Sequence, residues 1–174
     1  LIEILNMFNI EFPNKEIKSF HLAEGPGGFI EALINYRETN NKNVYQNDKY
    51  YGMTLINDTD ENIPGWKKSK IFLSKYPNVK IIVGSDNTGN LLNVKNLWYC
   101  YNNFKNSIDF ITGDGGFDFS TDFNQQEHLS IKLIFAQIAY AIAMQKKGGI
   151  FILKVFDIFT QVTIDLLYIL SSVY

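Results

Sequence analysis

The chain has 174 residues, of which 46% are hydrophobic, and a formal net charge of −2 at pH 7. This length and apolar content suit one globular domain with a sizeable core. The acidic balance argues against a polybasic coat for nucleic acid, although a local basic groove remains compatible with it. The single cysteine, Cys100, excludes an internal disulfide and is expected to be a small buried side chain. His21 and His128 have no partners at ligand spacing, so we expect no metal site.

The first part of the chain carries signals for a helix, a strand and a glycine-rich turn. A helix is expected over 1–9, which lacks the basic start and long apolar stretch of a signal peptide. An apolar strand over 17–22 ends at Glu24-Gly25-Pro26-Gly27-Gly28, and a helix over 29–37 follows.

The middle of the chain continues this alternation. A second strand is expected over 49–55, followed by an irregular connection over 57–70. A β-branched strand over 79–83 comes next, then a helix over 94–104 and another strand over 107–112.

The last part begins with a long apolar helix, expected over 125–146. Gly148 and Gly149 follow it and are a good C-terminal stop. The apolar part of this helix, Leu129 to Met144, is shorter than the ~20 residues that a bilayer span needs. We therefore expect a buried helix in an intracellular protein and no contact with a membrane. A strand over 150–156 and a helix over 160–174 complete the pattern.

The repeated alternation of strands and helices predicts an α/β fold, in which helices cover both faces of a parallel sheet. We expect residues 1–174 to form one domain. Because the chain starts inside a helix and stops inside an apolar run, we expect that domain to be truncated at both ends.

Three predicted strand ends carry features that suit a ligand site, since ligands of open α/β sheets bind outside the carboxyl ends of the strands. These features are Gly25 to Gly28, Gly84-Ser85-Asp86 and Gly113-Asp114-Gly115-Gly116. Lys154, in the last predicted strand, is a fourth. The first turn is not a dinucleotide GxGxxG motif, and the methionine carboxylate and ribose of S-adenosylmethionine could lie over it. A tight turn without a ligand is the alternative.

Asp86 is a candidate to accept a hydrogen bond from the adenine amino group, and a simple Asx turn is its alternative. Met53 and Thr54, at the end of the second strand, are weaker candidates to flank the adenosine.

The residues from His21 to Phe29 resemble the first motif of FtsJ-like ribose 2′-O-methyltransferases. Within that family they look most like the mRNA-cap enzymes of eukaryotes and viruses, including the Adrift type. Further segments are similar to those enzymes in order and spacing: 52–55, 111–117 and 148–159. The resemblance implies a Rossmann-like class I S-adenosylmethionine-dependent methyltransferase fold. It also implies capped mRNA as substrate and the capping or transcription machinery as partners. The expected location is the nucleus or cytoplasm, or a viral factory or virion.

The strand-end features and the resemblance together assign residues to the site. Those assigned to S-adenosylmethionine are Glu24, Gly25, Pro26, Gly27, Gly28, Phe29, Asp86 and Asp114. Of the Lys-Asp-Lys-Glu tetrad of these enzymes, the Asp falls on Asp114 and the second Lys on Lys154. The other two positions are expected to lie outside the chain. His21 departs from the family, because several relatives carry an acidic residue there.

Methyl transfer to a ribose hydroxyl requires the hydroxyl to lose its proton. Apolar neighbours are expected to desolvate Lys154 in part. The lysine would take the proton or orient the hydroxyl, while Asp114 orients the lysine. Gly115 and Gly116 would leave space for the ribose. The alternatives are a turn role for Asp114 and a lysine that extends to solvent.

Two further functions remain open, an inactive RNA-binding or scaffold subunit with the same fold and a dehydrogenase that lacks its usual motif. Trp66 with Lys67, Lys68 and Lys70 forms a dense basic and aromatic cluster. RNA phosphates and a solvated loop explain this cluster equally well.

Overall fold

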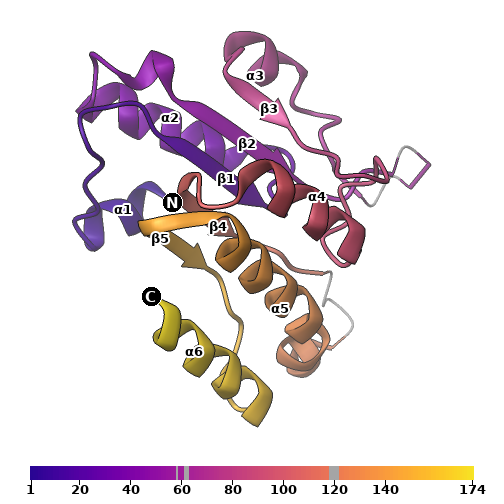
Figure 1. Ribbon diagram of the computed structural model, residues 1–174. Helices are drawn as coiled ribbons and strands as arrows, with labels where there is room; N and C mark the ends of the chain where they lie inside the picture. Colours follow the sequence, from indigo (N-terminus) through magenta and orange to yellow (C-terminus); the bar gives the residue numbers. More distant parts are fainter. Residues whose placement is uncertain (58, 61–62, 118–121) are drawn as a thin grey trace.

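A computed structural model describes residues 1–57, 59–60, 63–117 and 122–174 (Figure 1). In them, five parallel strands form one sheet in the order β3-β2-β1-β4-β5. Their bounds are β1 Lys18–Leu22, β2 Lys49–Met53, β3 Val79–Ile81, β4 Ile108–Gly113 and β5 Gln145–Leu153. The chain runs outward from β1 to β3 and then returns to place β4 on the other side of β1. The carboxyl ends of β1 and β4 therefore form the switch point where such sheets bind ligands.

Helices cover both faces of the sheet, as expected. They are α1 Ile2–Met7, α2 Gly28–Asn40, α3 Lys70–Lys75, α4 Val94–Phe104, α5 Gln126–Met144 and α6 Gln161–Val173, with short 3₁₀ turns at Tyr45–Asn47 and Phe123–Gln125. Side chains of α1, α2 and α3 pack in one cluster with Tyr50 and Phe110 of the sheet. Side chains of α4 and α5 pack on the opposite face, and α6 lies beside α5 (Figure 1). The Rossmann-like α/β arrangement is confirmed.

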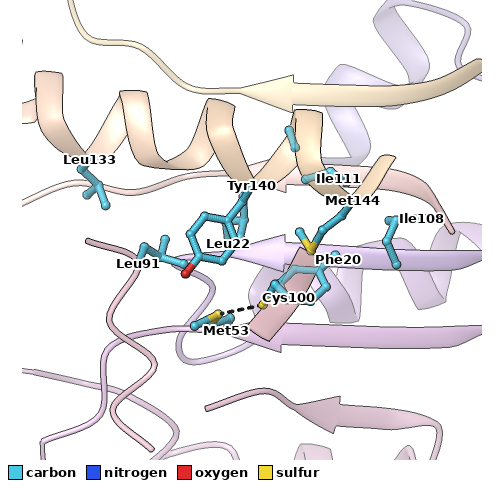
Figure 2. Close-up of a cluster of buried hydrophobic side chains, with 11 residues drawn as sticks. Phe20, Leu22, Met53, Leu91, Cys100, Ile108, Ile111, Leu133, Tyr140 and Met144 are labelled. Carbon is cyan, nitrogen blue, oxygen red and sulfur yellow. Dashed lines mark hydrogen bonds between the residues drawn. The ribbon is translucent and has the colours of Figure 1, made fainter. Parts of the chain in front are cut away.

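The core under α4 and α5 is apolar and closely packed. Phe20 and Leu22 of β1 are fully buried there, together with Tyr140 of α5 (Figure 2). Cys100 of α4 is also fully buried, and its Sγ lies 3.9 Å from the sulfur of Met53. Burial raises the pKa of Cys100 to about 12. The expectation that this cysteine is a small buried side chain is confirmed.

An ion pair is buried at the amino ends of the strands. Arg37 Nε lies 2.7 Å from Asp48 Oδ2, and both side chains are 0% exposed. Arg37 Nη2 donates a second hydrogen bond to Asp48 Oδ1, and the hydroxyl of Tyr50 donates to Oδ2. Two further guanidinium donors reach the carbonyl oxygens of Pro13 and Lys15. These bonds join α2 and β2 to the connection that leads into β1.

Two elements differ from the sequence-based expectations. The helix α3 was not expected, although its start at Lys70 agrees with an irregular connection before it. The long helix ends at Met144, and Gly148 and Gly149 lie inside β5 rather than at a helix stop. The pairing of β4 with β5 shifts register between Ile108 and Phe110, and Gly148 has a φ of 78°. The glycines thus form a bulge. Among the described residues, no helix is long and apolar enough to cross a membrane.

Candidate active site

Asp114 and Lys154 form an ion pair at the carboxyl ends of β4 and β5. Lys154 Nζ lies 2.7 Å from Asp114 Oδ1, and the two side chains are 43% and 36% exposed. Backbone hydrogen bonds fix both residues, because the amide of Asp114 donates to the carbonyl oxygen of Leu22 and the amide of Lys154 donates to that of Gly113. The structure therefore brings together the two residues to which catalysis was assigned.

The surroundings of Lys154 correct one expectation. Lys154 follows β5 instead of lying within it, and its ammonium is not buried. Its neighbours Leu153 and Val155 pack toward α5 and α6. Nζ itself lies 5.0 Å from the centre of the Phe156 ring, in a cation–π contact. The lysine side chain is thus partly covered, but its apolar sequence neighbours pack away from it instead of enclosing its ammonium group.

The glycines after Asp114 have different environments. Gly115 is buried, its amide donates to Gln137 Oε1 at 2.9 Å, and an added Cβ would lie 2.8 Å from Leu133. It serves close packing on α5, so the expectation that it leaves room for a ribose is wrong. Gly116 is exposed, and an added Cβ would lie 3.2 Å from the ring of Phe156 and 3.7 Å from Lys154 Nζ. Of these two glycines, Gly116 is the one that adjoins the ion pair, and a side chain there would crowd Phe156.

Glu24 lies in the turn after β1 and is only 5% exposed. Its Oε1 accepts hydrogen bonds from the amides of Phe29 and Ile30, which satisfies two donors at the start of α2. Burial raises the pKa of Glu24 to about 7, and the nearby charge of Asp114 adds to this effect, although the two amides oppose it. Glu24 and Asp114 are thus neighbouring acids at the switch point.

The glycine-rich turn has a protein-facing side and an open side. A Cβ at Gly25 would lie 2.3 Å from the carbonyl oxygen of Gly65, and Gly27, with a φ of 112°, faces Phe72. Gly28 and Pro26 are exposed, and nothing lies within 4 Å of a Cβ built at Gly28. A ligand can therefore approach the main chain at Gly28, where α2 begins.

Asp86 follows β3 and lies in an Asx turn. Its Oδ1 accepts hydrogen bonds from the amide and the hydroxyl of Thr88 and from Asn96 Nδ2. Its Oδ2 accepts one hydrogen bond, from Asn93 Nδ2. The hydrogen bonds from Thr88 contribute most to lowering the pKa of Asp86 below its usual range. The carboxylate is held firmly as an anion, and Oδ2, with one donor, keeps capacity for another. Adenine binding by Asp86 stays a prediction.

The side chain of Met53 lies in the core beneath the sheet and is 0% exposed (Figure 2). The expectation that it flanks an adenosine at the open edge is therefore wrong. Thr54 is 9% exposed, and its methyl group faces Gly25. His21 is fully buried between Thr112 and Ser19, and burial lowers its pKa to about 3, so it is neutral near pH 7.

The segment from Lys154 to Thr160 is fixed at both ends. At its start, the amide of Lys154 is bonded to Gly113 of β4. At its end, Glu127 of α5 accepts from the amides of Phe159 and Thr160 and from the Thr160 hydroxyl. Burial alone would raise the pKa of Glu127, but these hydrogen bonds lower it to about 2. The position of the lysine thus depends on both α5 and β4.

Comparison with known proteins agrees with this arrangement. The family model described as FtsJ-like methyltransferase matches residues 1–174. The chain belongs to the FtsJ-like methyltransferase family. The resemblance inferred from the sequence motifs is confirmed, and so is the Rossmann-like fold that it implies.

Curated relatives of this FtsJ-like chain include cap enzymes. The chain is 30% identical over 97% of its length to the cap-specific mRNA (nucleoside-2′-O-)-methyltransferase 2 of Danio rerio, and covers 23% of that protein. It is 29% identical over 86% of its length to the cap-specific mRNA (nucleoside-2′-O-)-methyltransferase 1 of Trypanosoma brucei brucei, and covers 38% of it. A protein of Acanthamoeba polyphaga mimivirus, named only as uncharacterized, is 34% identical over the whole chain, which covers 22% of that protein. The chain thus spans about a quarter of the length of most of these relatives.

The FtsJ-like fold gathers the predicted site residues along one edge of the sheet. Glu24 and Asp114 lie at adjacent strand ends, Lys154 lies one strand further, and Asp86 lies beyond β3 on the other side. Two residues that support this edge were missed by the sequence analysis: Gln137, which fixes Gly115, and Asn96, whose Oδ1 accepts from Ser85. Each lies in a helix more than ten positions away along the chain from the backbone that it fixes, so no local motif marks it.

Proposed function

We propose that this chain is the core of an S-adenosylmethionine-dependent RNA methyltransferase that modifies a ribose 2′-hydroxyl near the cap of mRNA. The observation that carries the proposal is the 2.7 Å pair between Lys154 and Asp114, next to the open glycine-rich turn. The cap-specific relatives support the choice of substrate.

The residues at the turn fit S-adenosylmethionine. Gly28 leaves the backbone open to a ligand, and Phe29 begins the following helix turn beside it. Glu24 and Asp114 place acidic groups near a ligand that carries a positive sulfonium and a positive ammonium. When bound, S-adenosylmethionine supplies an electrophilic methyl group. In this proposal Glu24 to Phe29 hold its methionine and ribose parts, and Asp86 accepts from its adenine amino group.

Lys154 orients the acceptor in this proposal. An ammonium group has three N–H donors. In Lys154, one donor is used in the ion pair with Asp114 Oδ1, and a second in a hydrogen bond to the Asp114 carbonyl oxygen, 3.3 Å from Nζ. The third can hold the oxygen of the target hydroxyl. The ion pair with Asp114 orients the ammonium group, so we assign Lys154 to binding and orientation. The hydroxyl proton then leaves to water, to which both side chains are exposed.

The test is methyl transfer to capped and uncapped RNA by the full-length protein, with the modified nucleotide mapped. Lys154→Ala should lower the turnover rate by about 10²–10⁴-fold while S-adenosylmethionine still binds. Lys147→Ala is the matched control, since Lys147 is exposed near the opposite end of β5. Near-normal turnover of Lys154→Ala would overturn the assignment.

An inactive subunit that binds RNA and keeps the fold is the second candidate. The same assay separates the two candidates, because such a subunit would bind RNA without modifying any nucleotide.

A further inference from the structure

Positive charge is concentrated in one stretch of this acidic chain. Every charged residue within 63–85 is a lysine, while the chain as a whole has a net charge of −2. The members of this stretch are Lys67, Lys68, Lys70, Lys75 and Lys80. A run of one sign in a chain of the opposite sign creates a local positive field, which attracts anions.

Topology divides these lysines between the two edges of the sheet. Because β2 and β3 are parallel, the connection through α3 must return from the carboxyl edge to the amino edge (Figure 1). Lys67, Lys68 and Lys70 come at the start of this return, so they lie at the edge that carries the candidate active site. Lys75 and Lys80 come later, toward the other edge.

Specific contacts hold the first three lysines beside the glycine-rich turn. The ring of Trp66 fills the space that a Cβ of Gly52 would occupy, and it also packs near Gly27. The hydroxyl of Ser69 donates to the carbonyl oxygen of Pro26. The lysines on either side of these anchors are exposed, and Lys67 Nζ donates to the carbonyl of Asp60. The backbone is fixed, while the side chains of the three lysines remain exposed.

The chemistry of this surface suits phosphates better than bases. Trp66 is engaged with the backbone of β2 and the turn, so its ring is not a free platform for stacking. Exposed lysines bind phosphates as point charges and without sequence preference. The surface therefore offers an electrostatic contact that positions a strand and does not read its sequence.

We infer that Lys67, Lys68 and Lys70 bind backbone phosphates of the RNA whose target ribose lies at Lys154. This inference rests on the proposed function. Lys154 follows β5 and the three lysines follow β2, with β4 and β1 between these strands. Three strand spacings of ~4.8 Å give a separation of about 14 Å. At ~3.4 Å per nucleotide, about four nucleotides span that distance. One RNA strand can thus contact the ion pair and the lysines together. An acidic protein segment would not explain why the lysines share an edge with the site.

The test measures equilibrium binding of capped and uncapped single-stranded RNA to the full-length protein at several salt concentrations. The variant Lys67→Ala/Lys68→Ala/Lys70→Ala should weaken binding at least about tenfold and reduce the salt slope by about 2, equally for both RNAs. The S-adenosylmethionine affinity should not change. The matched control is Lys42→Ala/Lys49→Ala/Lys80→Ala, three exposed lysines away from the site edge, which should bind RNA like the unmodified protein. Arginine at positions 67, 68 and 70 should keep the affinity.

Two outcomes would overturn the inference while leaving the proposed function intact. In the first, the full-length protein methylates RNA, but the triple alanine variant keeps the RNA affinity and the salt slope of the unmodified protein. The second is a loss of affinity for a polyglutamate peptide without a loss for RNA, which would indicate an acidic protein partner. A full-length protein that binds RNA through these lysines but transfers no methyl group would instead contradict the proposed function alone.

Discussion

The two edges of the sheet each carry an ion pair of the same length, and the pairs have opposite consequences. Arg37 and Asp48 at the amino edge, and Lys154 and Asp114 at the carboxyl edge, each have an N–O distance of 2.7 Å. The first pair is completely buried, whereas the side chains of the second are 43% and 36% exposed. Distance alone therefore does not distinguish a structural pair from a functional one, and the surroundings do.

At the amino edge, burial makes the pair costly to break. The desolvated charges are balanced by each other and by further hydrogen bonds from neighbouring groups. At the carboxyl edge, water screens the pair, so its contribution to stability is small. The same exposure leaves donor capacity on Lys154 for a substrate. The sheet thus places stability at one edge and chemistry at the other.

The strongest way to break this comparison is Arg37→Ala. The change leaves the carboxylate of Asp48 buried without its partner, and should lower the free energy of unfolding by about 3–5 kcal/mol. Lys154→Ala should change it by about 1 kcal/mol or less. Urea unfolding of both variants measures the difference. Equal losses in the two variants would contradict the division between the edges.

The pH dependence of stability sharpens the comparison at Glu24. The pKa of Glu24 is raised from 4.5 to about 7 in the folded protein, so the unfolded chain ionises first. The contribution of Glu24 to the free energy of unfolding is complete below pH 4.5 and is lost as the pH rises to about 7. The loss amounts to about 3 kcal/mol. Glu24→Gln should remove this part of the pH dependence. Unfolding curves between pH 4 and 8 test it, and parallel profiles for the two proteins would count against the assignment.

The smallest expected effects separate packing from ligand binding within one turn. Gly25→Ala places a methyl group against the backbone of Gly65 and should cost about 1–3 kcal/mol of stability. Gly28→Ala meets open space, so stability should stay within about 1 kcal/mol. If the cofactor lies against Gly28, however, its affinity should fall. Calorimetric titration with S-adenosylmethionine decides this, and an unchanged affinity would place the cofactor elsewhere.

Much of the fold could be predicted because apolar periodicity and glycines mark the strand ends. The convergence of Gly25 to Gly28, Asp114 and Lys154 followed from the rule that parallel strands end at one edge. The start of β5 could not be predicted in this way. Gly148 and Gly149 form a bulge, and a glycine pair after an apolar helix has the same local pattern as a helix stop.

The errors at the site have physical causes too. The apolar neighbours of Lys154 in sequence suggested that they partly desolvate it. Leu153 and Val155 instead pack inward, and the lysine side chain between them lies outside that cluster. Met53 ends a strand at the site edge, but its side chain points into the core. Gln137 and Asn96 act across long separations in sequence, which a motif cannot show.

Glu127 has a further consequence for hydrogen exchange. The amides of Phe159 and Thr160 are bonded to a carboxylate of α5, so they should exchange with solvent only when α5 and the start of α6 separate. With a pKa of about 2, Glu127 keeps this bond at acidities that protonate Glu24. The segment that carries Lys154 therefore belongs to the same cooperative unit as the helix behind it.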